Sequence, residues 1–582
     1  MVNRGRSAGC LTCKQRRVKC DELKPACGAC RRLKLRCQGY ARPSGYAKLK
    51  FRDENHKFAT DTNQRVDAGC NGDVSEASTT LSRSPASCSQ LCDFNSTITL
   101  RRISEPDTAV LFYLSNYASA GRDMCSTRGF FEMLIPTYFA QPQDSALTLA
   151  VSVLASAVLS MWRNDPSGFC TPQVSYTRAI KRLRVATQDP VERSQSATAL
   201  AALALQTYEN AAAVFVLRPA SSIHHCGAAS LLPSLDTQGT DGTVRTYLRK
   251  FMLHTEVSSA IRQRKPLRDI TYSYIESKDT PSVSENPSSA LDTIGILVAE
   301  LQSWYLQINT RDFSKAPLKY STWKAKLKDV DTQLLAWAEN VPDHWRPATL
   351  VSGREFDSSI PSFQNMCHVY PSCQIASIWN LWRFHRILLM KMMLGSLDAS
   401  SYSACLGAAG ESALSQARDF VNSQATLRGM VDDVCHSIPF YLGNRATGST
   451  LTDFTDPSIL LPIDRSIGNA TPPDGYCPNA GVSRDEHRSH VIAQGPWRAM
   501  HPLSSLLTLF SEDDDNKVTS LLRPGQQKWV CQQFARVATV LRLQSRSNNQ
   551  VKRTVDLEEG TYTSVETLAR DARKGAILMS GP

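Results

Sequence analysis

Six cysteines lie within the 28 residues from Cys10 to Cys37, in the pattern C-x2-C-x6-C-x6-C-x2-C-x6-C. The spacing C-x2-C-x6-C occurs in two successive triplets: Cys10, Cys13 and Cys20, then Cys27, Cys30 and Cys37. A C-x2-C pair can place two sulfur atoms on one metal ion, and soft thiolates select zinc over magnesium or calcium. Residues 1–9 are polar and basic, without the apolar run of a secretory signal. We therefore expect a zinc site rather than a disulfide framework.

The number of sulfur atoms indicates how many ions the site holds. Zinc prefers four ligands in a tetrahedron, so each triplet is one ligand short and two separate ions would need eight ligands. Six cysteines can complete two ions if the ions share two sulfur atoms. The repeat suggests that the shared residues are equivalent ones, Cys10 and Cys27. The sequence therefore predicts a binuclear cluster with two zinc ions.

Basic residues fill the interval between the second and third cysteine of each triplet. The first interval reads KQRRVK, residues 14–19, and the second reads RRLKLR, residues 31–36. A planar arginine side chain can donate two hydrogen bonds to O6 and N7 of guanine in the major groove, while other basic side chains contact phosphates. These intervals are candidates for DNA contacts. Solvated charges on a purely structural zinc site would have the same composition.

The stretch resembles the DNA-binding module of the fungal binuclear zinc cluster (Zn2Cys6) transcription factors, including its RRVKCDE and KPAC segments. The resemblance implies two short helices packed around the metals, the first of which reads a CGG-type triplet of double-stranded DNA. It implies base contacts from Arg16 and Arg17, and contacts on or near phosphates from Lys14 and Lys19. It also implies two ligand sets, one for each zinc: Cys10, Cys13, Cys20 and Cys27, and Cys10, Cys27, Cys30 and Cys37.

The charge of the chain is concentrated beside these cysteines. The 582 residues include 66 Lys and Arg and 54 Asp and Glu, a formal net charge of +12. Residues 1–60 hold 16 of the basic and 4 of the acidic residues, so the remaining 522 residues are neutral overall. Such localisation is expected of a nucleic-acid-binding module. Together with the resemblance, it predicts a nuclear, sequence-specific transcription regulator of RNA polymerase II genes.

Three regions follow from the composition: a DNA-binding domain at 1–40, a flexible linker at 41–100 and an all-α regulatory domain at 101–582. The linker is rich in Ser, Thr, Asp, Asn and Gly. Many members of the resembled family dimerise through a coiled coil just after the cluster, but residues 47–58 have too few apolar positions for heptads. A homodimer would therefore need another contact surface. The helical region is expected to bind coregulators.

The region beyond residue 100 shows helical periodicity and few alternating β-branched runs. Ser145 to Trp162 contains no charged residue for 18 positions, a length that could span a membrane. Four serines and four alanines in it favour a buried core helix instead. We therefore expect no membrane partner.

Several segments resemble, in order, the helical domain of fungal-specific transcription factors: ASSIHHCGAASLL at 220–232, QLLAWAENVPDHWRP at 333–347, ASIWNLWRFHRILL at 376–389 and VDDVCHSIPFYLG at 431–443. The expected fold is thus a small metal-organised Zn2Cys6 module, with two short helices around two zincs, followed by a large all-α domain.

Other clusters of potential ligands are less specific. The adjacent residues His224, His225 and Cys226 could bind a metal or form a Cys–His pair. No carboxylate or further ligand accompanies them at usable spacing, so a role in packing or capping is the better interpretation. His487 and His490 fall within residues 448–494, whose Pro, Gly and Asn content predicts an exposed loop.

The sequence contains no Gly-x-Gly-x-x-Gly turn, phosphate-binding Walker loop, Gly-x-Ser-x-Gly elbow or His-Glu-x-x-His pair. We therefore expect no enzymatic activity. The alternative is an enzyme or a small-molecule sensor with a zinc-binding appendix, which clustered His and carboxylates or an apolar cavity in the helical region would favour.

Overall fold

The computed structural model consists of two compact units, Met1–Thr97 and Ile98–Pro582, which are described separately. In the first unit it describes residues 10, 12–13, 18, 20–21, 26–35 and 37. In the second it describes residues 105–571 except 120–129, 165–173, 216–218, 236–238, 276–285, 308–316, 397–410, 464–481, 513–517, 544–564 and 568. The predicted linker at 41–100 lies outside the described residues.

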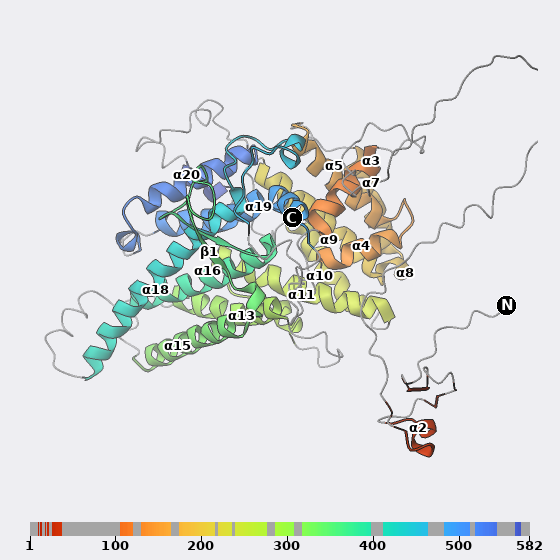
Figure 1. Ribbon diagram of the computed structural model, residues 1–582, viewed down its shortest axis with the longest axis horizontal. Coiled ribbons are helices and arrows are strands. Elements are labelled where there is room, and N and C mark those ends of the chain that lie inside the picture. The colour runs from red at the N-terminus through yellow and green to blue at the C-terminus, as the bar shows by residue number, and fades with distance from the viewer. Residues whose placement is uncertain are drawn as a thin grey trace, which may run out of the picture. The chain divides into compact units, whose positions relative to one another are not determined.

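In the described part of the first unit, helix α2 (Gly28–Arg32) lies beside the cysteines, and Thr12 and Cys13 are also helical. Its buried residues are four cysteines: Cys10, Cys13, Cys27 and Cys30. The second unit is largely helical, as predicted (Figure 1). Its first half contains α3 (Glu105–Tyr113), the π-helix η2 (Leu114–Ser119), α4 (Phe130–Phe139), α5 (Ala146–Trp162), α7 (Val174–Gln188), α8 (Pro190–Arg193), α9 (Ser196–Phe215), α10 (Ile223–Leu231), η3 (Leu232–Ser234), α11 (Gly239–Gln263) and α12 (Asp269–Ser273).

The second half of this unit has fewer and longer helices. In chain order its elements are α13 (Pro287–Gln307), α15 (Pro317–Asn340), η4 (Asp343–Trp345), β1 (Ala348–Val351), β2 (Met366–Val369), α16 (Cys373–Ser396), α18 (Glu411–Leu442), η5 (Leu451–Phe454), α19 (Arg484–Ser511), η6 (Thr519–Leu521) and α20 (Gln526–Val540). Helix α16 packs against α18, and α18 and α20 both pack against α19.

Helices α5 and α9 form the centre of the first half. They pack against each other, and α9 is buried at nearly every position. The Ser145 side chain caps α5 by accepting a 3.1 Å hydrogen bond from the Thr148 N–H. Helices that are apolar on all sides belong in a core, and none of the described helices is long and apolar enough to cross a bilayer. The interpretation of Ser145 to Trp162 as a core helix is therefore confirmed.

Three tryptophans connect the helices of the second half. The Trp337 indole donates to the Pro287 carbonyl, that of Trp379 to the Trp345 carbonyl, and that of Trp382 to the Leu334 carbonyl, each at 2.7 Å. Each indole N–H thus has a carbonyl partner while its ring is buried. These bonds tie α15 to the start of α13, and tie α16 to α15 and η4.

The all-α prediction is wrong at one place. Strands β1 and β2 form an antiparallel pair with Ala348 opposite Val369 and Val351 opposite Met366. Pro347 precedes β1, and the β-branched Thr349 and Val351 favour an extended backbone. The strands are only four residues long, so their alternation is too short to stand out in a sequence, and their pairing partner lies across a loop.

The predicted loop at 448–494 is irregular up to residue 463 but wrong from Arg484 on, and residues 464–481 lie outside the described residues. Residues 443–463 form an irregular segment with one short helix, η5, but α19 begins at Arg484. Ser483 and Glu486 form a reciprocal capping box that starts this helix. Pro496 and Pro502 lie inside α19.

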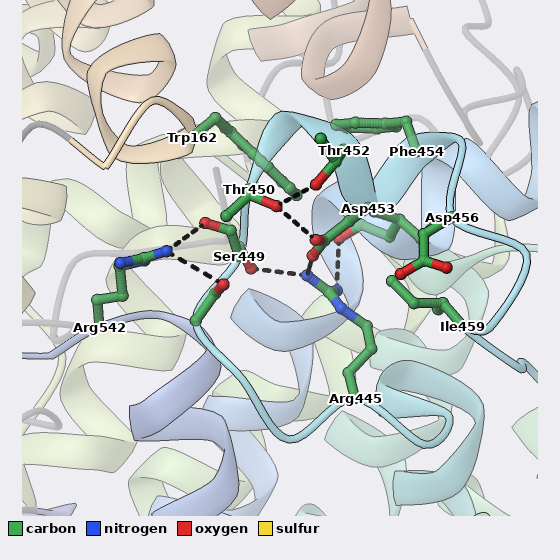
Figure 2. Close-up of polar contacts among 12 residues, drawn as sticks. Trp162, Arg445, Ser449, Thr450, Thr452, Asp453, Phe454, Asp456, Ile459 and Arg542 are labelled. Carbon is green, nitrogen blue, oxygen red and sulfur yellow. Dashed lines mark hydrogen bonds and ion pairs between the residues drawn. The ribbon is translucent and has the colours of Figure 1, made fainter. Parts of the chain in front are cut away.

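Two arginines hold the segment after α18, as Figure 2 shows, and one of them, Arg445, is buried. Arg445 donates to the Ser449 hydroxyl at 2.6 Å and to the Asp453 carboxylate at 2.9 Å. Thr450 donates to the other oxygen of the same carboxylate at 2.9 Å, and Arg542 donates to the Gly448 and Ser449 carbonyls at 3.2 Å. Charged hydrogen bonds therefore replace regular secondary structure in this segment.

Candidate metal centre and nucleic-acid interface

The six cysteines converge into two overlapping groups of four. One group contains Cys10, Cys13, Cys20 and Cys27, and the other contains Cys10, Cys27, Cys30 and Cys37. Within each group all sulfur atoms lie within 4.8 Å of one another, and the groups have Cys10 and Cys27 in common. The sulfur atoms of Cys10 and Cys27 are 3.6 Å apart.

These separations fit tetrahedral zinc. A Zn–S bond of about 2.3 Å gives sulfur–sulfur edges of about 3.8 Å in a tetrahedron. The Sγ of Cys10 is 3.8 Å from that of Cys30, and the Sγ of Cys13 is 3.6 Å from that of Cys27. The residues present therefore match the donor set and the spacing that two zinc ions sharing two sulfurs require.

The two halves of the site repeat each other in their hydrogen bonds as well as in their sequence. The Cys13 N–H donates to the Cys10 sulfur at 3.4 Å, and 17 residues later the Cys30 N–H donates to the Cys27 sulfur at 3.3 Å. In the same way, the N–H of Val18 donates to the Cys13 carbonyl at 3.1 Å and that of Leu35 donates to the Cys30 carbonyl at 3.0 Å. The two triplets thus share these two kinds of hydrogen bond at equivalent positions.

Asp21 connects the two halves, and sequence reasoning did not assign it a role. Both oxygens of its carboxylate accept from the Gly28 N–H, at 3.0 and 2.8 Å. A negative charge at the start of α2 complements the unpaired N–H groups there. A Cβ at position 28 would clash with the Asp21 carboxylate, so a larger residue there would displace this side chain. The acidic residue directly after Cys20 was the available signal.

Burial makes the sulfurs depend on a cation. It raises the pKa of the Cys30 thiol to about 12 and raises that of the Cys13 thiol further. Without a cation these thiols would stay protonated at neutral pH, whereas zinc deprotonates a coordinating thiol. Contacts among neutral thiols contribute little to stability, so we expect the site to fold only with its metal bound.

The predicted DNA-contacting residues Lys14, Arg16, Arg17 and Lys19 lie outside the described residues. In the second half, α2 presents Arg31 and Arg32 to solvent, and the exposed Lys34 follows it. The described part of the cluster therefore has a cysteine interior and a basic exterior.

The other potential metal ligands named from the sequence belong to the helical unit. His225 is buried and its Nε2 is 2.6 Å from the Glu256 carboxylate, while Arg268 also donates to Glu256. His225 is therefore a packed, ion-paired side chain, as predicted. Its neighbour Cys226 is exposed. His487 and His490 are buried in α19, and His490 Nε2 accepts from the Cys373 N–H at 3.0 Å. Their prediction as exposed loop residues is wrong.

Residues 8–47 match the family model of the fungal Zn(2)-Cys(6) binuclear cluster domain. This match covers the six cysteines and the basic intervals, so the two zinc ions predicted from ligand counting are confirmed.

Short stretches of the chain are also similar to characterised fungal proteins. "White-opaque regulator 2" of Candida albicans is 43% identical over 61 residues, 10% of this chain and 13% of the relative. "Sterol uptake control protein 2" of the same organism is 69% identical over 32 residues, 6% of this chain and 4% of the relative. "Transcription factor dibT" of Pestalotiopsis microspora is 50% identical over 42 residues, 7% of each protein. The chain thus matches only 4 to 13% of the length of these relatives. No solved structure matches it significantly.

Proposed function

We propose that this chain, whose residues 8–47 form a fungal Zn(2)-Cys(6) binuclear cluster domain, is a sequence-specific, DNA-binding transcription regulator. One observation carries the proposal: the metal-binding module lies in the same 60 residues that hold the whole net positive charge of the chain. Residues 1–60 have a formal charge of +12 and the rest of the chain has none. A surface of this kind provides the phosphate contacts on which DNA affinity depends.

The ligand assignment follows the two groups of sulfur atoms. We propose that one zinc binds Cys10, Cys13, Cys20 and Cys27, that the other binds Cys10, Cys27, Cys30 and Cys37, and that Cys10 and Cys27 bridge them. The sulfur separations of 3.6 to 3.8 Å support this assignment.

The repeat offers a guide to the first half, where the reading residues are expected. A shift of 17 positions relates Lys14 to Arg31 and Arg17 to Lys34, both of which are exposed in the second half. We propose that the first half, like the second, begins with a short helix, that its basic interval directs Arg16 and Arg17 to the guanines of a CGG-type triplet, and that Lys14 and Lys19 lie at phosphates. Each bidentate Arg–guanine pair would contribute about 1–3 kcal/mol of discrimination.

The proposal extends to the cell. The relatives named as regulators support a nuclear protein acting on RNA polymerase II genes, with coregulators binding the helical unit. A homodimer would have to form without a coiled coil directly after the cluster. We propose no enzymatic activity.

Binding-site selection with the intact protein tests this function. The full chain, loaded with zinc, is incubated with a pool of random duplexes, and the bound sequences are determined. We expect enrichment of a CGG-type triplet, single for a monomer and paired for a dimer, and loss of enrichment after chelation. A pool recovered without any sequence preference, or equally with and without metal, would contradict the proposal.

A further inference from the structure

A second group of metal-ligand side chains lies in the helical unit, far from the cysteines in sequence. His368 comes from β2, and Asp433 and His436 come from α18. One potential ligand atom from each lies within 4.8 Å of the other two. Asp433 and His436 are three residues apart, so both project from the same face of their helix. Strand β2 packs against α18 and supplies the third side chain.

Both histidines are buried, and the ring nitrogens of His436 are available to a ligand. The side chain of His436 is 97% buried, and neither of its ring nitrogens has a hydrogen-bond partner among the described residues. Its ring packs edge-on against that of His368, with 5.3 Å between the centroids. A buried polar group without a partner is costly, and such groups are rare in folded proteins. A ligand that His436 can bind would remove this cost.

The three side chains differ in exposure. His368 and His436 are buried, whereas the Asp433 side chain is 35% exposed and so gives the group a connection to solvent. The arrangement is therefore two imidazoles inside and one carboxylate at the opening.

The positively charged side chain of Arg383 lies beside these three residues. The Nε of Arg383 is 4.0 Å from the Asp433 carboxylate, and its Nη2 is 3.4 Å from Nδ1 of His368. The shorter hydrogen bonds of Arg383 go elsewhere, at 2.8 Å to the Tyr370 hydroxyl and 2.9 Å to Asn380. A metal ion would therefore replace only long contacts of Arg383, although repulsion from the guanidinium lowers its affinity.

We propose that His368, Asp433 and His436 bind one zinc-class divalent cation, a third metal ion in addition to the two of the cluster. Two imidazole nitrogens and one carboxylate are a zinc donor set, and a water molecule would complete the tetrahedron. The ion would join strand β2 to helix α18 and so lock the hairpin onto the helical unit. Because of Arg383 it binds more weakly than the thiolate-held ions. This site does not depend on DNA binding by the cluster.

Zinc counting on the full chain tests the proposal. The protein is dialysed to equilibrium against free zinc, and the bound metal per chain is measured for the wild type, Asp433→Asn and His436→Gln. We expect three ions for the wild type and two for each variant. Asp432→Asn is the matched control, because this carboxylate is the neighbour on the same helix but binds Arg523 and Gln526, and it should retain three ions. Two ions in the wild type, or three in both ligand variants, would overturn the proposal.

A spectroscopic readout distinguishes this site from the cluster. Cobalt in a thiolate site gives sulfur-to-metal charge-transfer absorption, whereas cobalt bound by nitrogen and oxygen gives only d–d bands. Titration should therefore add a final equivalent that has d–d absorption alone and that Asp433→Asn removes. If circular dichroism shows that His436→Gln is unfolded, the partly exposed Asp433→Asn still decides the question. If every equivalent carries charge-transfer absorption, the site does not exist. Loss of DNA binding would leave this result unchanged.

Discussion

The two units of this chain bury different kinds of side chain, and the difference predicts how each one fails. In the described part of the first unit, the fully buried residues are four cysteines, and the residues packed on them are Cys20, Cys37 and Ala29. The second unit buries a continuous cluster of aliphatic and aromatic side chains from nearly all its elements. Metal coordination must supply most of the folding free energy of the first, while burial of apolar surface supplies that of the second.

Cysteine illustrates the contrast, since both units bury it. Cys367, Cys373, Cys435 and Cys531 are buried and unbridged in the helical unit, and none of them belongs to a ligand group among the described residues. Burial raises the pKa of Cys373 to about 12, so it is a neutral core thiol. The same residue type is therefore a metal ligand in one unit and a small apolar side chain in the other, and its neighbours decide which.

The largest expected effect is in the cluster. Cys27→Ser should remove both zinc ions and abolish DNA binding, because a bridging sulfur serves both ions, whereas Cys37→Ser should remove about one. Structural zinc contributes about 10–16 kcal/mol to the folding of small domains, so loss of both ions unfolds the module. Zinc per chain and duplex binding measure this. The exposed Cys226→Ser is the control and should change neither; equal zinc loss in the two cluster variants would refute the bridging assignment.

The second prediction breaks only the helical unit. Phe440→Ala should destabilise it by about 4 kcal/mol, because the ring is fully buried and packs 5.4 Å from that of Tyr370. All nine tryptophans lie beyond residue 98, so their fluorescence during urea unfolding reports on this unit alone. The two cluster zincs should stay bound. Val421→Ala, at an exposed position of the same helix, should change stability by less than about 0.5 kcal/mol. Simultaneous release of cluster zinc would show that the units do not fold independently.

The third prediction concerns the buried ion pairs of the helical unit. Burial alone raises the pKa of the Glu256 carboxyl, but hydrogen bonds from His225 and Arg268 bring it below its ordinary value. The carboxylate therefore stabilises the folded state above its unfolded pKa of about 4.3, and this contribution is lost as the pH falls through the lower folded value. Glu256→Gln should cost roughly 3 kcal/mol at neutral pH.

Urea unfolding at several pH values measures this cost. The difference between the wild type and Glu256→Gln should shrink once the pH falls below about 4. Glu339→Gln, at an exposed carboxylate, provides the comparison and should have little effect at any pH. A difference that stays constant from neutral to strongly acidic pH would mean that the charge of Glu256 contributes nothing.

The smallest predicted changes divide the basic surface into two functions. Arg17→Ala should cost about 1–3 kcal/mol on the preferred site and relax the base preference, since it removes a base contact. Lys14→Ala should weaken binding to all sequences alike and reduce the salt dependence by about one unit. Fluorescence anisotropy with specific and scrambled duplexes at several salt concentrations measures both. Identical behaviour of the two variants would rule out the division into base and phosphate contacts.

Local signals predicted much of the helical fold. Helix α5 lies within the uncharged stretch from Ser145 to Trp162, where a core helix was predicted, and Ser145 caps it. The start of α19 was missed although Ser483 and Glu486 carry a readable capping signal, because the Pro, Gly and Asn content of residues 448–494 outweighed it. In the structure, Gly495 lies against the Tyr441 carbonyl, where a Cβ would clash. This glycine therefore allows α19 to pack closely on α18. The periodicity of apolar residues in the sequence does not reveal such a contact.

The binuclear centre could be predicted from local sequence alone. Its ligands lie within 28 residues, and the number and spacing of sulfurs limit how zinc can be shared, so counting them was sufficient. The proximity of His368 to Asp433 and His436, and that of His225 to Glu256, could be found only in the folded helical unit. These contacts join residues on different elements, and their distance depends on how a strand and several helices pack. No spacing along the chain encodes that packing locally, because it results from burial summed over the whole helical unit.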